Sequence, residues 1–399
     1  MPFYKRVGEI PPKRHTQFRA PDGSLYAEEL MGVEGFSSDS ALLYHRHLPT
    51  AITNAVTVTD SFGTGAVTER STANLPLKPR SFRSQDLKFS GDEIDAVRHR
   101  RLLFTNNDVS IRFSAPNATS PLYRNAAGDE LLYIQTGTAT VETIYGALDV
   151  AEGDYVVLPT SCTYRVVPTG DEQLRMLVVE ATGHIGPPKR YLSAKGQFLE
   201  HSPYCERDLR VPEQPLLLDG TDVDVYVRHR EGMTRMTYAH HPFDVVGWDG
   251  CLYPWVFNIR DFEPITGRVH QPPPVHQTFE GPNFVVCSFC PRKVDYHPLS
   301  VPVPYNHANV DSDELMFYVG GDYEARKGSG IGLGSLSLHP SGCTHGPQPG
   351  AVEASLGAER FDETAVMIDT FRPLHLGEAA EACEDPAYAW SWSGRGPEA

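Results

Sequence analysis

The sequence predicts a mainly β chain made of two related β-barrel domains, with an extended N-terminal arm and few short helices. The first observation is length, because 399 residues exceed one compact core and suit two domains of ordinary size. The second is composition, because 34 Gly and 33 Pro favour many short strands over a helical bundle. The third is a residue pattern that occurs twice. We therefore expect an N-terminal domain over residues 1–265 and a C-terminal domain over residues 266–399.

Strand signals recur along the chain after an aperiodic start. The first 50 residues are rich in Gly, Pro and charge, but aromatic anchors such as Phe18 and Tyr26 favour an ordered arm over disorder. The best helical pattern covers only residues 377–383, Pro386 should end it, and residues 391–399 are expected to fray. The expected strands, which are rich in β-branched residues and bounded by turn formers, are 55–59, 109–113, 131–134, 139–144, 155–158, 175–180, 223–227, 284–289, 314–319 and 335–338.

Composition narrows the class of partner and the compartment. The formal net charge is −16, so nucleic acid, which requires a basic surface, is not an expected partner. No run of 18 apolar residues is present, so no membrane helix is expected. The first residues lack the apolar core of a secretory signal. Seven Cys form an odd and sparse set, which indicates reduced thiols and a cytoplasmic protein.

The second half of the chain contains a two-part motif of His, Glu, Gly and Pro. Its spacing matches the two motifs of the cupin superfamily, whose members are small jelly-roll β-barrels. The first part differs from the common pattern only in having Asn309 in place of a second His. The motif consists of His307-x-Asn309-x4-Glu314-x6-Gly321 and Gly334-x5-Pro340-x-Gly342-x2-His345.

The same skeleton occurs about 180 residues earlier, without its histidines. Tyr replaces both His, and a neutral phenol with an ordinary pKa near 10 is a poor ligand for a divalent metal. We therefore expect two cupin-like barrels (a bicupin), of which the first is a metal-free scaffold and the second holds the metal. The earlier copy is Tyr123-x-Asn125-x4-Glu130-x6-Gly137 followed by Gly153-x5-Pro159-x-Ser161-x2-Tyr164.

Two imidazoles and one carboxylate, from His307, Glu314 and His345, would leave about three coordination positions open on a metal. That arrangement is typical of non-haem Fe(II) oxygenases, whereas structural zinc favours a closed tetrahedron. Fe(II) is therefore the expected cofactor. Asp313 is a rival ligand, but neighbours in a strand face opposite sides and the motif spacing selects Glu314. The plain alternative is that these His are ordinary polar residues of a barrel.

Other chemistry-bearing residues have weaker patterns. His270 and His276 flank a run of three prolines that stiffens an extended segment, so they are either candidate general bases or solvated residues of a linker. Cys287 and Cys290 are interpreted as core thiols, and Gly328–Gly334 as a loop between strands. The histidine pairs His45/His47 and His240/His241 are interpreted as structural or surface residues.

Beyond these motifs, the chain resembles bacterial homogentisate 1,2-dioxygenases from about residue 1 to about residue 375. The resemblance implies an Fe(II) dioxygenase that cleaves the ring of a small aromatic acid with O2, converting homogentisate to maleylacetoacetate in tyrosine and phenylalanine catabolism. It also implies a homo-oligomer, a trimer or a hexamer. The segments that carry it are Gly8–Arg19, Leu25–Gly32, Gly35–Ser40, Leu43–Arg46, Pro304–Asn309, Glu314–Met316, Tyr323–Ala325 and Thr344–Pro347.

The resemblance also implies roles for single residues, and it leaves alternatives. Six residues separate His307 from Glu314, one more than in better-characterised members, so the exact aromatic substrate stays open. A sister ring-cleaving enzyme for another hydroquinone or aromatic acid is one alternative, and a non-catalytic cupin binding protein is another. The implied roles are metal ligation by His307, Glu314 and His345, acid–base catalysis by His276 (with His270 as its rival), and substrate contact by Tyr323, His339 and His345.

Overall fold

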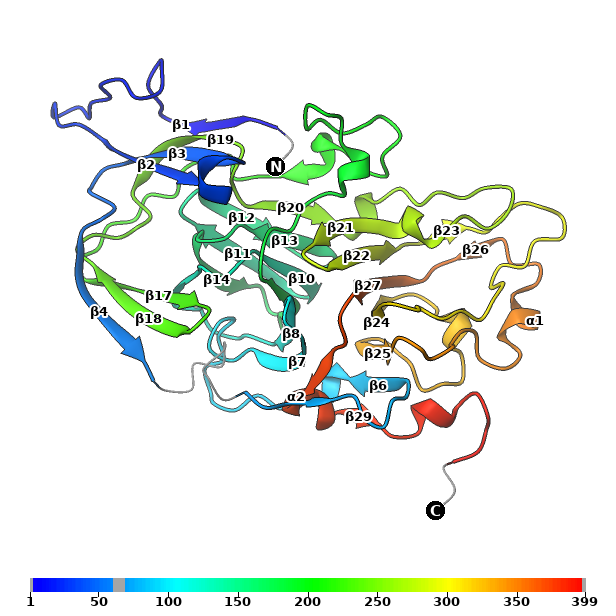
Figure 1. Cartoon of the computed structure of the whole chain (residues 1–399). Coiled ribbons are helices and arrows are strands. Elements are labelled where there is room, and N and C mark those ends of the chain that lie inside the picture. Colours follow the sequence, from blue (N-terminus) through cyan, green and yellow to red (C-terminus); the bar gives the residue numbers. More distant parts are fainter. Residues whose placement is uncertain (1–2, 60–68, 397–399) are drawn as a thin grey trace. The chain divides into compact units, whose positions relative to one another are not determined.

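The computed structural model describes residues 3–59 and 69–396, in which 29 strands accompany two short α-helices. The expectation of a mainly β chain with few short helices is confirmed (Figure 1). The chain divides into two compact units. Unit 1 takes the described residues of Met1–Glu69, Phe89–Arg101 and Phe113–Asn258, and unit 2 takes those of Arg70–Lys88, Leu102–Arg112 and Ile259–Ala399.

Unit 1 contains two sheets that share one apolar core. Alternate residues of a strand face that core, as Leu132 and Ile134 do from one sheet and Val141 from the other. One sheet has the order β12 (Gly146–Val150), β11 (Thr138–Thr143), β14 (Thr163–Thr169), β9 (Leu122–Asn125), β17 (Val223–His229), β18 (Gly232–Tyr238) and β4 (Ile52–Val58). The other has the order β16 (Leu209–Arg210), β20 (Trp255–Asn258), β13 (Asp154–Leu158), β10 (Glu130–Thr136) and β15 (Arg175–Ala181) within this unit, and the loops of the unit contain η3 (Lys189–Tyr191) and η4 (Glu206–Asp208).

The N-terminal arm is ordered in a further sheet of unit 1, as the sequence predicts. Phe18 and Tyr26 pack against a small core with Tyr44, so the aromatic anchors do hold the arm. The hydroxyl of Tyr4 and the guanidinium of Arg14 both contact the Asp249 carboxylate. The sheet has the order β1 (Lys5–Gly8), β19 (Val245–Gly250), β3 (Ser40–His45) and β2 (Ala27–Gly32), with η1 (Glu34–Phe36) after β2.

Unit 2 is built on one mostly antiparallel sheet with an apolar inner face. Met316 and Tyr318 from one strand pack with Ala365 and Met367 from the next, and Cys287 joins them as a core thiol, as expected. The sheet has the order β21 (Gln277–Gly281), β22 (Phe284–Phe289), β27 (Thr364–Thr370), β24 (Asp313–Gly320), β25 (Ser335–His339), β6 (Arg80–Arg83) and β29 (Glu384–Asp385). The predicted loop Gly328–Gly334 lies between β24 and β25.

Short elements complete unit 2. The described helix α2 (Glu378–Glu381) lies inside the predicted helical stretch 377–383. The remaining strands are β23 (Arg292–Lys293), β26 (Arg360–Phe361), β28 (His375–Gly377) and β5 (Ser71–Ala73), together with β7 (Arg101–Thr105) and β8 (Val109–Ser114), which lie mostly in this unit. The remaining helices are α1 (Ala351–Ser355), η2 (Ser84–Asp86), η5 (Ile259–Asp261), η6 (Pro273–His276), η7 (Glu324–Arg326) and η8 (Tyr388–Trp390).

The repeated motif folds in the same way in both units. Its Gly after the Glu has a left-handed backbone in each copy, with φ of +76° at Gly137 and +75° at Gly321. A Cβ at Gly321 would lie 1.6 Å from the carbonyl oxygen of Asp362, so glycine is required there. The two Tyr of the first motif pair across strands, and the two His of the second form the corresponding bridge. This internal equivalence supports the predicted bicupin fold.

The expectation that residues 391–399 fray is wrong for the part that the structure describes. Trp392 packs on Tyr388 with a ring-centroid distance of 5.2 Å, and its indole N–H donates to the carbonyl oxygens of Gly346 and Pro347. An aromatic pair therefore holds the chain end against the loop that carries His345. Residues 397–399 lie outside the described residues.

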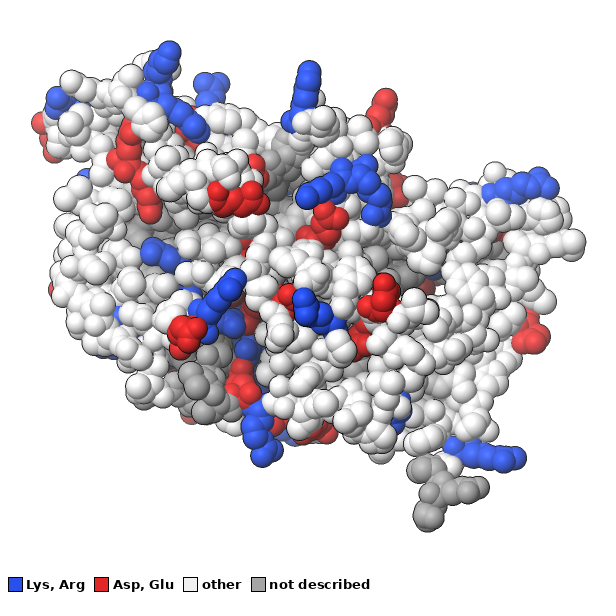
Figure 2. All heavy atoms as spheres, viewed as in Figure 1, with Lys and Arg blue, Asp and Glu red and all other residues white. Residues whose placement is uncertain are grey.

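Two surface properties bear on partners. In the described part of the chain, no helix has the length and apolar character needed to cross a membrane. On the face shown in Figure 2, basic and acidic side chains are interspersed, so the net charge is not gathered in one patch there.

Candidate metal centre

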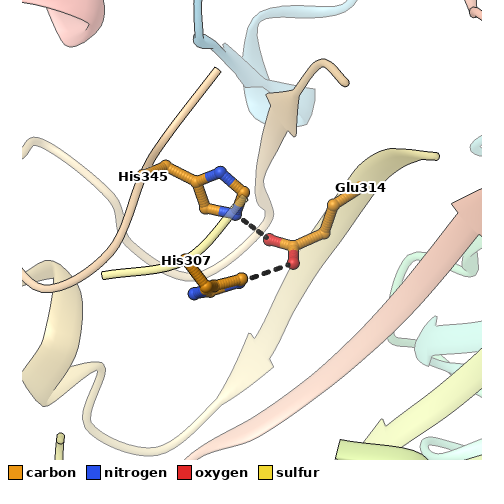
Figure 3. A group of neighbouring side chains, drawn as sticks. All are labelled: His307, Glu314 and His345. Atoms are coloured by element: carbon orange, nitrogen blue, oxygen red, sulfur yellow. Dashed lines mark hydrogen bonds and ion pairs between the residues drawn. The ribbon is translucent and has the colours of Figure 1, made fainter. Parts of the chain in front are cut away.

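Three side chains from three separate segments of unit 2 converge at one point. His307 and His345 lie in loops joined by a two-residue β-bridge, and Glu314 lies at the start of β24. Nε2 of His307 lies 3.4 Å from one carboxylate oxygen of Glu314, and Nε2 of His345 lies 3.4 Å from the other (Figure 3). Their candidate ligand atoms all lie within 4.8 Å of one another, and they form the one such group of three found among the described residues.

The strand alternation selects Glu314 over Asp313, as the sequence predicts. The Asp313 carboxylate turns away and accepts backbone N–H groups of Ser341 and Leu374 at 2.9 and 2.8 Å. Burial alone would raise the pKa of Glu314, but hydrogen bonds with His307 and His339 hold that pKa well below its usual range. Glu314 is therefore ionised and available as an anionic ligand.

The donor set fits a metal ion. Nδ1 of His345 is 3.0 Å from the carbonyl oxygen of Cys343, so Nδ1 carries the proton and Nε2 keeps its lone pair. That Nε2 atom is buried and has no hydrogen-bond partner, which is costly unless a cation completes the site. Two neutral imidazoles and one carboxylate match the donors that first-row divalent metals take.

His339, an expected substrate contact, lies behind Glu314. Its Nδ1–H donates to Glu314 at 2.9 Å, and its Nε2 accepts the hydroxyl proton of Tyr388 at 2.9 Å. Its side chain is fully buried and is not among the residues that line the cavity described below. Burial and the charge of Arg326 lower its pKa to about 3, so the ring is neutral. His339 thus orients the carboxylate, and Tyr388 was not found from the sequence because it lies in no motif.

A cavity of about 270 Å³ in unit 2 opens beside His307 and Glu314. Met316, Tyr318 and Met367 supply an apolar wall. A cavity of this size with an apolar wall and polar groups around it suits a small aromatic ligand that carries polar substituents. Its polar lining residues include His270, His276, Tyr305, Asn309, Arg292, Arg326 and Asp369.

The two histidines of the proline segment both lie on the cavity wall, so the interpretation as a linker is wrong. His276 is buried and stacks on Phe289 at a centroid distance of 4.4 Å, and its Nδ1 has no hydrogen-bond partner. Burial, with the charge of Arg292, lowers the pKa of His276 to about 3. His270 is more exposed, with Nδ1 3.5 Å from the Asp295 carboxylate and Nε2 3.1 Å from the hydroxyl of Tyr305.

Arg326 is a buried cation on the cavity wall that the sequence did not single out. Its Nε donates to the hydroxyl of Tyr318 at 3.2 Å, and Nη1 donates to the carbonyl oxygen of Gly346. Among the described residues, no carboxylate forms an ion pair with it. Tyr323, an expected substrate contact, packs its ring on Tyr318 at 4.9 Å and is not among the cavity-lining residues.

The equivalent position in unit 1 is filled by an arginine. The buried guanidinium of Arg100 lies 3.0 Å from Glu130, 2.8 Å from Glu180 and 2.6 Å from the hydroxyl of Tyr164. Tyr164 and Glu130 stand at the motif positions of His345 and Glu314. A fixed organic cation therefore contacts the side chains that stand at the motif positions of two metal ligands in unit 2.

The remaining histidine pairs of the sequence come together elsewhere in unit 1. His45 is buried between Asp244 at 2.6 Å and Glu29 at 2.9 Å. The rings of His47 and His240 stack at 3.9 Å. The contacts of His45 hold β2 and β3 to the segment before β19.

Comparisons with known proteins agree with this architecture. Family models described as homogentisate 1,2-dioxygenase N-terminal and C-terminal match residues 5–259 and 270–396. A protein of Saccharolobus solfataricus named "Putative dioxygenase SSO1533" is 37% identical over 98% of this chain and 99% of its own length. Homogentisate 1,2-dioxygenase of Sinorhizobium medicae is 28% identical over 68% of this chain, but the match spans only 62% of that relative.

Solved structures add distant cupin neighbours. The S161A mutant of Bacillus subtilis oxalate decarboxylase OxdC covers 79% of this chain and 81% of its own, with a TM-score of 0.33 and 12% identity. The family models, in contrast, cover most of the chain in two consecutive matches. On the strength of those matches, this chain belongs to the homogentisate 1,2-dioxygenase family.

Proposed function

We propose that this chain is an Fe(II)-dependent ring-cleaving dioxygenase that acts on homogentisate and O2 to give maleylacetoacetate, in tyrosine and phenylalanine catabolism. The observation that carries the proposal is the convergence of His307, Glu314 and His345 beside a cavity large enough for an aromatic ring. Bound Fe(II) would supply the redox-active centre for a phenol and O2, which requires open coordination positions.

Arg326 is the residue that we propose holds the carboxylate of the substrate. It is a cation without a carboxylate partner among the described residues, and it lines the cavity. The phenol of Tyr318 and the carbonyl of Gly346 fix its guanidinium, so one edge can serve a ligand at little entropic cost. An acid is therefore favoured over a neutral hydroquinone.

His270 is the acid–base residue that the geometry supports, in place of His276. An imidazole whose Nδ1 faces a carboxylate, as that of His270 faces Asp295 at 3.5 Å, is oriented by it, so its Nε2 can accept a phenol proton. His276 stays neutral and, with a pKa lowered to about 3, is a weak base. We assign it a stacking and hydrogen-bonding role at the wall that it shares with Phe289.

His339 is proposed to act through Glu314 rather than on the substrate. Its bonds to Glu314 and Tyr388 fix the carboxylate plane, and such supporting groups often change metal affinity about 10–100-fold. Tyr323 is proposed to support the wall formed by Tyr318, with which its ring packs.

The test is anaerobic loading with Fe(II), followed by oxygen uptake with homogentisate and identification of the product. We expect one O2 per homogentisate and a ring-opened product. Gentisate and catechols in the same assay would reveal the alternative, a sister enzyme for another aromatic substrate. If the iron-loaded protein takes up no oxygen with any of these compounds, the proposal is refuted and a binding protein is favoured. Light scattering would test the proposed trimer or hexamer.

A further inference from the structure

The cavity beside the metal ligands contains a second carboxyl group that the proposed reaction does not use. Asp369 lies on β27 directly opposite Glu314 on β24. Cross-strand partners project from the same face of a sheet, with Cβ atoms about 4.5–5.5 Å apart. Both residues line the cavity. Asp369 is therefore the neighbour of the metal ligand on the side where a substrate must lie.

The Asp369 carboxyl is only half satisfied by the protein. The side-chain amide of Asn309 donates to Oδ1 at 3.3 Å. Among the described residues, that is the one hydrogen bond recorded for this carboxyl, and no Lys or Arg pairs with it. Oδ2 therefore remains available to a ligand in the cavity.

The corresponding carboxylate of unit 1 has different partners. There the equivalent carboxylate, Glu180, lies opposite Glu130 in the same register. Arg100 at 2.8 Å and Arg228 both pair with Glu180. A partly buried carboxyl without such compensation is unfavourable unless another group completes it. The absence of an arginine beside Asp369 indicates that a ligand donor completes the site in unit 2.

The next pair of residues along the same strands limits what that donor can be. On the same face of the sheet, Met316 lies opposite Met367, two residues along each strand from the Glu314 and Asp369 pair. The cavity floor therefore becomes apolar about 7 Å from that pair. A substrate carboxylate placed beside Asp369 would meet two acidic neighbours, whereas Arg326 offers it a cation. A hydroxyl on the ring has the donor that Asp369 lacks.

We propose that Asp369 is a specificity-determining residue whose free oxygen accepts a hydrogen bond from the second ring hydroxyl of a dihydroxy aromatic acid. This inference rests on the proposed function in taking a dihydroxy acid as the ligand. Asn309 holds the other oxygen of the carboxyl in place, and the ring lies over Met316 and Met367. The enzyme thereby discriminates against phenols with a single hydroxyl and against acids whose carboxylate would occupy this position.

The test measures binding without turnover, in anaerobic Fe(II)-loaded protein, by calorimetry. The ligands are homogentisate, 2-hydroxyphenylacetate and 3-hydroxyphenylacetate, each of the latter keeping one of the two hydroxyls. The variants are Asp369→Leu, which removes the acceptor, and Asp369→Asn, which keeps an oxygen of similar position. Ile368→Val is the matched control, because Ile368 lies on the same strand opposite Leu315 and is not among the cavity-lining residues. Iron is quantified in every sample.

We expect the wild type to bind homogentisate about tenfold tighter than the single phenol that keeps the metal-binding hydroxyl, which is the effect of one hydrogen bond. The affinity ratio between homogentisate and the single phenol that keeps the metal-binding hydroxyl should fall close to one in Asp369→Leu and persist in Ile368→Val. An unchanged ratio in Asp369→Leu overturns the inference. A gain in affinity for all three acids in Asp369→Asn also overturns it. Such a gain would mean that the carboxylate of the ligand lies beside Asp369 and is repelled by it in the wild type. The proposed reaction is tested separately, because oxygen uptake by the wild type does not depend on this affinity ratio.

Discussion

Replacing Arg100 by Met should destabilise unit 1 strongly, because its guanidinium is the cation around which the motif of that unit is organised. Arg100 is buried and contacts Glu130, Glu180 and the hydroxyl of Tyr164. Removing one partner of a buried ion pair leaves an uncompensated charge and costs about 3–5 kcal/mol. Glu180 keeps its pair with Arg228, so most of that cost falls on Glu130.

Urea unfolding followed by tryptophan fluorescence can measure this loss in unit 1 alone. The four tryptophans are Trp248 and Trp255 in unit 1 and Trp390 and Trp392 in unit 2. A parent variant in which Trp390 and Trp392 are changed to Phe therefore gives a fluorescence signal from unit 1 alone. With a denaturant slope of about 2–3 kcal/mol per M, a loss of about 3–5 kcal/mol lowers the midpoint by about 1–2 M.

A second substitution provides the control for the charge. Arg100→Met combined with Glu130→Gln removes the stranded carboxylate, so the double variant should be more stable than Arg100→Met alone. A midpoint that moves by less than about 0.3 M in Arg100→Met, or a double variant less stable than either single one, would refute the role of Arg100 as the substitute cation.

Three further outcomes are expected. Glu314→Gln should lose bound iron while Asp313→Asn keeps it, as elemental analysis would show; the reverse result would mean that the wrong carboxylate was assigned. His270→Gln should retain iron and lose most of kcat, by about 10²–10⁴-fold, whereas His276→Asn should bind substrate more weakly with a smaller loss of kcat; equal kcat values in His270→Gln and wild type would exclude His270 as the base. Burial would lower the pKa of His45, but hydrogen bonds to carboxylates raise it to about 9, so its stabilising effect is complete below pH 6.5 and is lost as the pH rises through 9. Thermal melts of wild type and His45→Gln should therefore differ most at pH 6 and converge near pH 10, and a gap that widens with pH would contradict this assignment.

The features that depend on the spacing of residues within a short segment could be predicted from the sequence. The motif glycines require a left-handed backbone, and that requirement is met at Gly137 and Gly321 in both copies. Strand alternation was enough to choose Glu314 over Asp313, because neighbouring residues on a strand cannot face the same side. The pairing of the two histidines was also encoded, since the same register joins Tyr123 to Tyr164 in unit 1.

Residues that join the site from distant strands or turns were not predictable in this way. Arg100, Arg326 and Asp369 belong to no motif, and their roles follow from which partners the fold brings to them or withholds. The chain end was misjudged because a short run with Trp and Ser lacks helical period, although Trp392 finds an aromatic partner in Tyr388. Pattern alone cannot report such packing.

Burial distinguishes two histidines that the sequence left equivalent. His270 and His276 lie on the same proline-stiffened segment, and nothing in their spacing separates them. Their surroundings differ, because one faces the carboxylate of Asp295 and the other stacks on Phe289 with its pKa lowered, and our proposal of His270 as the base rests on that difference. A carboxylate 25 residues along the chain from His270 was not identifiable as its partner before the fold was known.

The metal stoichiometry of the purified, iron-loaded chain is the most direct test of a single metal centre in unit 2 and an arginine-filled counterpart in unit 1. We expect one iron per chain in the wild type, one in Tyr164→Phe, and none in His345→Ala with the protein still folded by circular dichroism. Two irons per chain, or full iron retention in His345→Ala, would contradict the assignment of His307, Glu314 and His345 as the site.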